Sequence, residues 1–317
     1  MTDFFNDKVI VLTGASGVIG THFLRSLNNI PMNNSVVIST YNRALPPHIE
    51  ALMTDVRFKF IPMDLTDNDH LKRLPRADVI IHAATLSPPQ LFLTNKTDTL
   101  KVNTTATFAL LDKLSVGGTF LYLSTSELYN GLTNVPFKET DIGVIPTDHP
   151  RASYIEAKRC GEVICLSSEK NVKIARASLV YGSGTRHNDG RVLYDFVDQA
   201  LTYGEIVIKG GRENIRTYCY AEDAIDMMWD VVIKGKDVIY NIGGTSVMTI
   251  TELANKIAIA TKTKFSFANK ESMHGSPSAV RVDMTKYNDE FGEYKYTSFL
   301  EGLSVVIDWQ KHLLTTK

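Results

Sequence analysis

The segment that decides the fold is Thr13-Gly14-Ala15-Ser16-Gly17-Val18-Ile19-Gly20. It follows a continuously apolar run, Val9 to Leu12, and opens a stretch with helical periodicity. Between a buried strand and a helix, Gly14 permits a tight turn, Gly17 lets backbone N–H groups approach a pyrophosphate, and Gly20 allows close helix–strand packing. A glycine-rich turn without a ligand is the alternative, but this setting favours a dinucleotide site. The site would also include Ser16, Val18 and Ile19.

Around this segment, short β-branched runs alternate with helical patterns. Strands are predicted at residues 8–13, 35–40, 56–62, 77–82, 119–124 and 172–176, and helices at about 17–29, 92–115 and 150–170. This alternation is typical of an α/β protein with a Rossmann-type, doubly wound parallel sheet. After Arg176 the pattern changes to short strands and helices near 191–203, 221–233, 249–262 and 297–313. We therefore expect a dinucleotide-binding domain over 1–180, joined again by chain from about 205–245, and a smaller, mainly substrate-binding domain over 181–317.

Composition excludes several classes of protein. The 317 residues are 44% hydrophobic and 22% charged, with 34 Lys and Arg against 35 Asp and Glu. Without a basic run, nothing predicts binding to nucleic acid or to an anionic membrane. No apolar run approaches the roughly 18 residues that would span a bilayer, so a cytoplasmic protein is expected. Three cysteines lack metal-ligand spacing, which predicts packing roles and no metal site.

The second and third strands bear on the choice of cofactor. The second strand ends in Ser39-Thr40-Tyr41-Asn42-Arg43, without the acid that usually holds the adenosine ribose of NAD about 20 residues beyond the glycines. Because Arg43 suits a ribose 2′-phosphate, NADP is not excluded beside NAD. Asp64, followed by Leu65, is a candidate adenine contact, and its alternative role is to cap a helix over 67–74.

A candidate catalytic group lies later in the chain. Tyr154 and Lys158 are four residues apart on a predicted helix, so they share a face. Tyrosine becomes a base at neutral pH only if its pKa of about 10 falls by about three units, which takes about 4 kcal/mol, and a nearby ammonium and nicotinamide cation can supply it. Most such pairs lie on solvated helix surfaces, but this one follows a strand that ends in Ser124-Thr125-Ser126-Glu127. There Thr125 can bind a substrate hydroxyl, and Glu127 is a candidate acid, base or orienting group, or caps the strand end.

Together these motifs resemble the extended short-chain dehydrogenase/reductase family of nucleotide-sugar epimerases, dehydratases and decarboxylases. The resemblance covers nearly the whole chain and includes Thr13 to Gly20, His82-Ala83-Ala84, Asn103, Thr125, Tyr154, Lys158, Arg216, Asp223 and Tyr240 to Gly244. It implies a bound nicotinamide cofactor and transient oxidation of a sugar at carbon 4. Tyr154 would then accept the proton of the 4-hydroxyl, Thr125 would orient the oxygen, and Lys158 would hold the cofactor ribose. It also implies a homodimer formed by the helices near 92–115 and 150–170.

Within that family the chain looks most like the UDP-glucuronate decarboxylases. The matching segments are Ser87-Pro88-Pro89, Ser124 to Glu127, Pro150 to Arg159 and Asn188 to Val192. The subgroup implies substrate-binding roles for Ser87 and Pro88, and a place near the sugar carboxylate and diphosphate for Arg281. Substrate phosphates need cationic donors, which Arg191, Arg216 and Arg281 can supply, and the alternative for each is a surface salt bridge. Ser178 stands where an asparagine often contacts the diphosphate, and Asn130 replaces a usual glycine.

Other reactions stay open at this point. Ser-Thr-Ser-Glu also occurs in 4,6-dehydratases, so dehydration or 4-epimerisation is the first alternative to decarboxylation. A UDP-sugar is the favoured substrate. An NADPH-dependent carbonyl reductase, which Arg43 would suit, and a non-catalytic dinucleotide sensor are further alternatives. A sensor would need neither Tyr154 nor Lys158, so their presence favours an enzyme.

Overall fold

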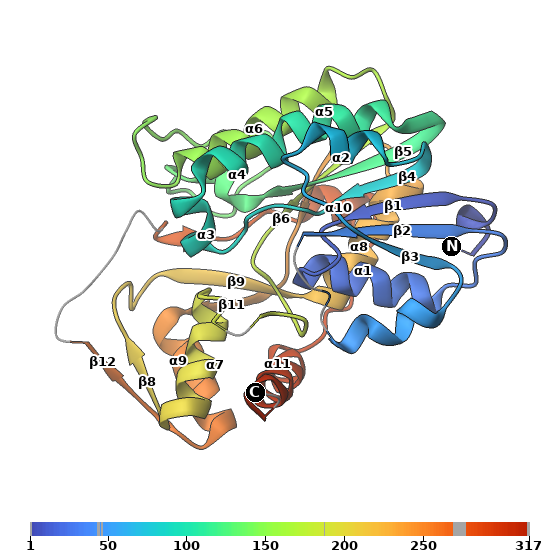
Figure 1. The fold of residues 1–317 in the computed structure, drawn as a ribbon. Helices are drawn as coiled ribbons and strands as arrows, with labels where there is room; N and C mark the ends of the chain where they lie inside the picture. The colour runs from blue at the N-terminus through green and yellow to red at the C-terminus, as the bar shows by residue number, and fades with distance from the viewer. Residues whose placement is uncertain (1, 43–44, 46, 187, 269–276, 316–317) are drawn as a thin grey trace.

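A computed structural model describes residues 2–42, 45, 47–186, 188–268 and 277–315 of the chain. Its centre is a seven-stranded parallel sheet with the strand order β10-β6-β5-β4-β1-β2-β3 (Figure 1). The strands are β1 (Val9–Thr13), β2 (Val36–Tyr41), β3 (Phe58–Pro62), β4 (Ala77–His82), β5 (Leu114–Thr125), β6 (Val172–Ala177) and β10 (Ile239–Ile242). The predicted doubly wound sheet is confirmed, and all six strands predicted in the first half are present.

Helices cover both faces of this sheet because its strands are apolar on both faces. Ile10 and Leu12 of β1 pack with Phe23 of α1 (Val18–Asn29) and Trp229 of α8 (Ala221–Lys234) in one core. Val11, between them, packs in a second core on the opposite face. There the covering helices are α2 (Asn68–Lys72), α4 (Lys96–Asn103), α5 (Thr105–Asp112) and α6 (Ala152–Leu166).

The single helix predicted over 92–115 is wrong. The chain forms α3 (Pro89–Thr94), α4 and α5, and β5 already begins at Leu114. The breaks fall at Asn95 and Thr104, whose backbones leave regular helical geometry. Both side chains donate to carbonyls of the preceding turn, Asn95 to Leu91 and Thr104 to Leu100. Such local bonds compete with helix continuation, and the apolar periodicity did not reveal them.

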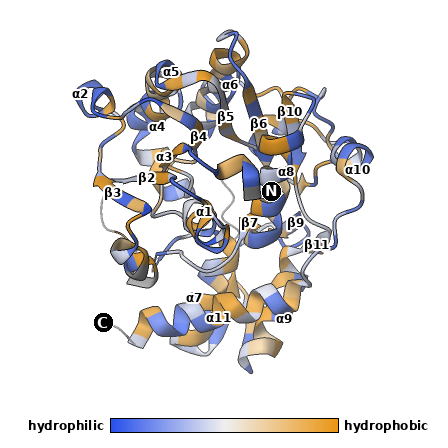
Figure 2. Cartoon of the chain, turned by 90° about the vertical axis from the view of Figure 1, so that its right-hand side faces the viewer, coloured by the Kyte–Doolittle hydropathy of each residue, from blue (hydrophilic) through white to orange (hydrophobic). Residues whose placement is uncertain are grey.

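A smaller domain lies beyond the carboxyl ends of the strands. Figure 2 shows its helices α7 (Val192–Tyr203), α9 (Ile250–Thr261) and α11 (Phe299–Thr315) gathered below the sheet domain. Strand β9 (Ile215–Tyr220) pairs with β7 (Val180–Tyr181), β11 (Ser246–Thr249) and β13 (Ala279–Val280), while β8 (Glu205–Ile208) pairs with β12 (Lys264–Phe267). Of the segment 205–245, therefore, only α8 and β10 rejoin the large sheet, and β8 and β9 belong to the smaller domain.

The remaining elements are short. They are the 3-10 helices η1 (Thr2–Phe5), η2 (Pro47–Thr54) and η3 (Ser126–Tyr129), and α10 (Thr285–Phe291). Cys165 and Cys219 are buried as expected of packing residues, but Cys160 is exposed on α6, so that prediction fails for it. Across the described ranges, no helix is long and apolar enough to cross a membrane, and no three His, Cys, Asp or Glu side chains group as metal ligands.

Candidate active site

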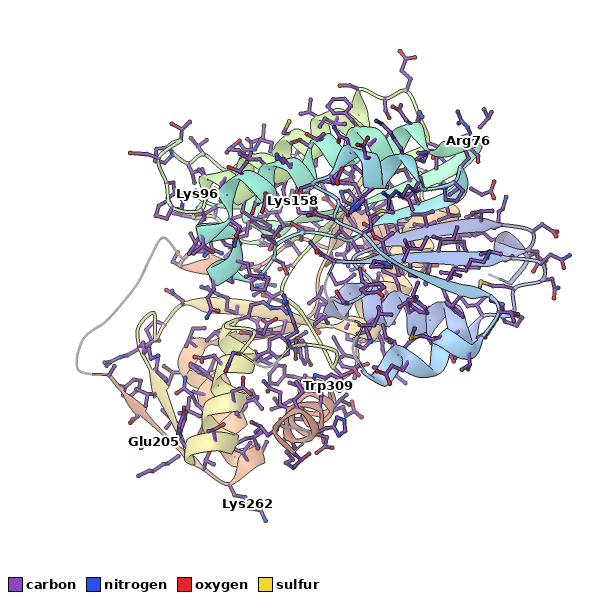
Figure 3. The ribbon with its side chains drawn as sticks, in the orientation of Figure 1. Arg76, Lys96, Lys158, Glu205, Lys262 and Trp309 are labelled. Carbon is purple, nitrogen blue, oxygen red and sulfur yellow. The ribbon has the colours of Figure 1, made fainter. Side chains whose placement is uncertain are left out.

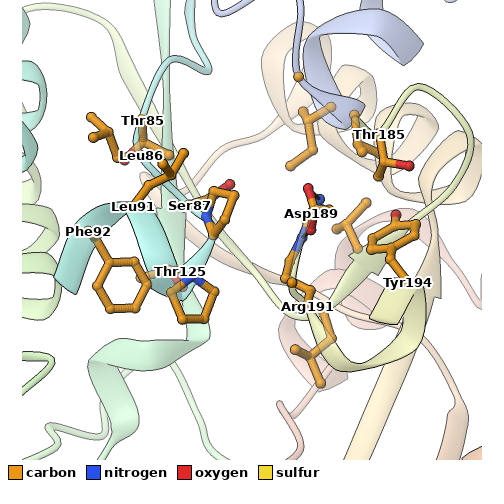
Figure 4. Close-up of a pocket in the computed structure, with 18 of the residues that line it drawn as sticks. Thr85, Leu86, Ser87, Leu91, Phe92, Thr125, Thr185, Asp189, Arg191 and Tyr194 are labelled. Carbon is orange, nitrogen blue, oxygen red and sulfur yellow. Dashed lines mark hydrogen bonds and ion pairs between the residues drawn. The ribbon is translucent and has the colours of Figure 1, made fainter. Parts of the chain in front are cut away.

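A cavity of about 1090 Å³ lies between the two domains. Its lining comes from the segments that follow β1 to β5 at their carboxyl ends, and from residues 177–196 and 207–216 on the other side. Figure 4 shows the two walls, with Ser87, Phe92 and Thr125 on one and Asp189, Arg191 and Tyr194 on the other. The cavity unites the two motifs singled out in the sequence, because its lining contains both the glycine segment and Tyr154.

The glycine segment has the geometry that its sequence predicts. Gly14 has a φ of 78°, and a Cβ there would lie 2.7 Å from the Cα of Ala84. A Cβ on Gly20 would overlap the carbonyl oxygen of Gly14, so helix and loop touch through these two glycines. Gly17, the N-cap residue of α1, leaves its surroundings open, with only the Gly14 oxygen 3.5 Å from an added Cβ. An open helix N-terminus that faces the cavity fits the pyrophosphate of NAD. The cavity lining also includes Ser16, Val18 and Ile19.

The ends of β2 and β3 line the cavity beside this loop. Asp64 accepts hydrogen bonds from the backbone N–H and the hydroxyl of Thr66, both at 2.9 Å. The residue that caps α2 is Asp67, so the helix-capping alternative for Asp64 is wrong. Asp64 and Leu65 both line the cavity, and an adenine contact stays a prediction. Arg43 lies outside the described residues.

At the end of β4, Ala83 and Ala84 line the cavity, and their contact with the cofactor stays a prediction. His82 is fully buried between the Thr13 hydroxyl at 2.8 Å and the Val102 carbonyl at 3.0 Å, and burial lowers its pKa to about 3, which makes it a neutral structural residue. Asn103 does not line the cavity. Its amide donates back to the Thr99 carbonyl at 2.7 Å within α4, and the expected cofactor contact stays a prediction.

Tyr154 lies at the cavity wall, beside the end of β5. Its ring stacks on Phe92 of α3 with a centroid distance of 4.7 Å, and its hydroxyl forms a hydrogen bond with the Thr125 side chain. Burial raises the pKa of Tyr154 to about 12, and Thr125, Arg151 and Arg191 oppose this only in part. The phenol is therefore protonated at rest, and further positive charge is needed for it to act as a base.

Lys158 lies one turn further along α6, in the interior of the sheet domain (Figure 3). Its Nζ donates to the Leu123 carbonyl at 2.5 Å and lies 5.0 Å from the centre of the Tyr122 ring. Burial lowers the pKa of Lys158 to about 7. The sequence predicted that this ammonium would acidify Tyr154, but the cationic neighbours that lower the pKa of the phenol here are Arg151 and Arg191.

Glu127 faces the cavity in an ion pair with Arg151, the N-cap residue of α6. The Nε and Nη2 of Arg151 donate to the two carboxylate oxygens at 2.8 and 2.6 Å. The capping role considered for Glu127 is wrong, because Thr125 caps η3 by accepting from the backbone N–H of Glu127. Ser126 also lines the cavity.

The opposite wall carries the candidate substrate residues. Arg191 donates to both oxygens of Asp189, at 2.5 and 3.0 Å, and its guanidinium lies over the Tyr194 ring. Arg216 of β9 also lines the cavity, as do Ser87 and Pro88 across from it.

Two of the predicted substrate residues lie outside the cavity. Arg281 is exposed, whereas its neighbour Val280 is buried and lines the cavity. Ser178 is fully buried, and Leu179, at a φ of 41°, lines the cavity in its place. Neither Arg281 nor Ser178 is among the residues that line the cavity, and their substrate-binding roles stay predictions.

Sequence reasoning also missed residues of the site. Arg151 precedes Tyr154 by three residues, a helical spacing that could have placed both on one face. Phe92 fell inside the helix predicted wrongly. Trp309 of α11 lines the cavity and donates its indole N–H to the Thr185 carbonyl at 2.9 Å, and nothing in its local sequence indicates this.

Comparisons with known proteins agree with this geometry. A sequence model of the NAD dependent epimerase/dehydratase family matches residues 10–243. UDP-glucuronic acid decarboxylase 5 of Arabidopsis thaliana is 26% identical over 302 residues, which are 94% of this chain and 87% of that protein. UDP-glucuronic acid decarboxylase 1 of Danio rerio is 27% identical over 309 residues, 95% of this chain and 72% of that protein. A dTDP-glucose 4,6-dehydratase of Streptomyces venezuelae, solved with NAD bound, superposes with a TM-score of 0.83 at 22% identity, over 96% of this chain and 97% of that one.

Proposed function

The chain belongs to the NAD dependent epimerase/dehydratase family, and on this premise we propose that it oxidises a nucleotide sugar at carbon 4 with bound NAD and then decarboxylates it. The observation that carries the proposal is the joint position of Tyr154, Thr125 and the glycine segment in one cavity. The curated relatives named above act on UDP-glucuronic acid by their names, which favours a UDP-sugar with a carboxylate on carbon 5.

The residues divide the cavity into two parts. Gly14, Ser16 and Gly17 would hold the pyrophosphate of NAD, and Lys158 its ribose. When bound, NAD supplies the hydride acceptor for carbon 4 and a positive charge near the phenol. Arg191 and Arg216, on the opposite wall, would hold the diphosphate of the substrate.

Tyr154 takes the proton of the 4-hydroxyl, and Thr125 orients that oxygen through its hydroxyl. The resulting ketone at carbon 4 lies β to the carboxylate carbon. The bond between carbons 5 and 6 then breaks, carbon dioxide leaves, and the electron pair forms an enolate that is protonated at carbon 5. Return of the hydride to carbon 4 and of the proton from Tyr154 to its oxygen would restore the 4-hydroxyl and leave no net consumption of NAD. If carbon 6 carries a hydroxyl instead, the same ketone acidifies carbon 5 and water can leave, which is the dehydratase alternative.

The proposal is tested by identifying the products that the protein forms from a panel of nucleotide sugars. Protein loaded with NAD is incubated with UDP-glucuronate, UDP-glucose, GDP-mannose and dTDP-glucose, and the products are separated and weighed by mass spectrometry. Loss of carbon dioxide from UDP-glucuronate is expected, without net consumption of NAD. Loss of water, or an isomer of unchanged mass, would replace decarboxylation by dehydration or epimerisation. Stoichiometric consumption of NADPH with a simple carbonyl, and no reaction of any sugar nucleotide, would point to a reductase.

We also propose a homodimer formed through α4, α5 and α6. Four apolar side chains of these helices are at least two-fifths exposed, namely Leu100, Phe108, Val163 and Leu166. Contact with a second copy would remove this surface from water. The cytoplasmic location expected from the sequence stays a prediction.

A further inference from the structure

The last helix of the chain, α11, reaches the cavity with two of its side chains. Trp309 and Leu313 line the cavity, and among the described residues of α11 they alone do so. They lie four residues apart, so they share one face of the helix. Both are partly exposed, and Figure 3 shows Trp309 on the side of α11 that faces the sheet domain. Two large apolar side chains at a cavity wall present surface that a bound molecule would cover.

The indole of Trp309 is bonded to the loop that follows β7. Its Nε1 donates to the carbonyl of Thr185, which is buried, at 2.9 Å. Directly before Thr185, Gly184 has a φ of 92°, and a Cβ there would lie 3.2 Å from the methyl group of Thr21. Thr21 belongs to α1, and its backbone N–H donates to the Gly17 carbonyl at 2.8 Å in the first turn of that helix. One short loop therefore separates the indole from the helix N-terminus that fits the pyrophosphate of NAD.

Hydrogen bonds fix both ends of this connection. On the side of the sheet domain, Nη1 of Arg25 in α1 donates to the Ser183 hydroxyl at 2.8 Å. On the side of α11, Gln310 is fully buried, and its Nε2 donates to the Tyr194 carbonyl at 3.1 Å and to Oδ1 of Asp198 at 3.0 Å. The loop is thus held on α1, and α11 is held on α7 next to the indole. These bonds keep the apolar face of α11 at the cavity wall.

The position of this face favours NAD over the nucleotide sugar as the molecule that it covers. The arginines that would hold the substrate diphosphate come from the start of α7, for Arg191, and from β9, for Arg216. The loop bonded to Trp309 contacts α1 instead, through Gly184 and Ser183. A side chain that covers a bound ligand acts mainly on the rate at which the ligand leaves. Trp309 and Leu313 are therefore placed to slow the release of NAD.

We propose that Trp309 and Leu313 cover bound NAD at its pyrophosphate and retain it from one turnover to the next. The inference rests on the proposed function, in which the same cofactor takes a hydride from carbon 4 and returns it. If NADH left between these two steps, the sugar would remain a ketone and the 4-hydroxyl would not be restored. Retention by α11 keeps the two hydride transfers on one cofactor molecule.

The release of NADH, measured without any sugar nucleotide, tests this proposal. Protein loaded with NADH is mixed with an excess of NAD in a stopped-flow instrument, and the loss of NADH fluorescence gives the dissociation rate. Trp309→Ala should speed release about tenfold or more, and Trp309→Phe, which keeps a ring but loses the N–H, should speed it less. Leu313→Ala should speed release about threefold. The Kd of UDP for the NAD-loaded variants, measured by calorimetry, should change less than about threefold.

Leu314→Ala is the matched control for Leu313→Ala. The two leucines are neighbours on α11 and both are partly exposed, but Leu314 does not line the cavity. Truncation of Leu314 removes the same atoms from the same helix, and it should change the release of NADH less than about twofold.

Three results would overturn the inference. The first is an unchanged rate of NADH release from the Trp309→Ala protein. The second is an equal rate for Leu313→Ala and Leu314→Ala, which decides the matter even if the tryptophan variants fail to fold. The third is weaker binding of UDP with unchanged release of NADH, which would assign Trp309 to the substrate nucleotide. Because NADH release is measured without a sugar nucleotide, a parent protein that converts none of the nucleotide sugars would overturn the proposed function alone.

Discussion

Burial of Lys158 makes a prediction about stability that can be worked out in numbers. Its side chain is about 1% exposed, and burial lowers its pKa from 10.5 to about 7. Each pH unit between these values corresponds to about 1.4 kcal/mol, so the ammonium destabilises the folded state by about 5 kcal/mol at and below pH 7. Between pH 7 and 10.5 the unfolded chain holds this proton and the folded chain does not. Stability therefore rises with pH in that window, and the penalty is gone above it.

Lys158→Met removes the amine and keeps a side chain of similar length. The variant loses the bond from Nζ to the Leu123 carbonyl, which leaves a buried acceptor unpaired at a cost of about 1–3 kcal/mol. At pH 6 the nucleotide-free variant should therefore be about 2–4 kcal/mol more stable than the parent protein. This advantage should shrink by about 1.4 kcal/mol per pH unit above pH 7 and reverse sign between about pH 8.5 and 10.

Urea denaturation of both nucleotide-free proteins at pH 6, 7, 8 and 9 measures this. The two proteins share all other titrating groups, so the contributions of those groups cancel in the difference between the two unfolding free energies. A difference that stays constant from pH 6 to 9 would refute the reasoning, since Lys158 would then keep an ordinary pKa in the folded state. A more stable variant that turns over no sugar nucleotide would show that this buried charge is retained for function.

Three further experiments test the site and its assembly. Tyr154→Phe should lower turnover by about a thousandfold with the Kd of NAD changed less than about threefold, and substantial residual turnover would remove Tyr154 from the mechanism. Gly20→Ala should destabilise the fold by about 2 kcal/mol or more in urea denaturation, because its Cβ overlaps the Gly14 oxygen. Gly17→Ala should fold normally and weaken the binding of NAD measured by calorimetry. Equal stability of the two variants would contradict this. Phe108→Asp should yield a monomer by sedimentation, while Ile259→Asp, at a more exposed position on α9, should leave the assembly intact. A monomeric parent protein would contradict the dimer.

The sheet domain could be predicted because its signals are local. In β1, apolar residues on both faces indicate a strand covered by two helix layers, and the glycines after it fix where the chain turns into α1. The break between α4 and α5 could not be predicted in this way. The backbone of Thr104 leaves regular helical geometry at the end of α4, and apolar periodicity does not register such a change.

The smaller domain shows a different limit. Strand β9 receives its partners β7, β11 and β13 from three distant parts of the sequence. The pairing depends on long-range contacts, so short apolar runs in this region did not reveal which sheet they would join. β8 and β9 were therefore expected at the large sheet and instead build the wall that carries Arg216.

Helical spacing is a firmer guide than position in an extended segment: Tyr154 and Lys158 both line the cavity, whereas Arg281 and Ser178 do not. A spacing of four residues fixes a shared helix face, whatever the rest of the fold does. In an extended segment, a shift of one residue moves a side chain to the opposite face, and only the strand pairing decides which residue faces inward. β13 pairs with β9 so that Val280 lies opposite Arg216 and lines the cavity. Arg216 also acts electrostatically on Glu127 and Arg151, so the register of β13 and β9 helps to decide which charged and which apolar side chains face this end of the cavity.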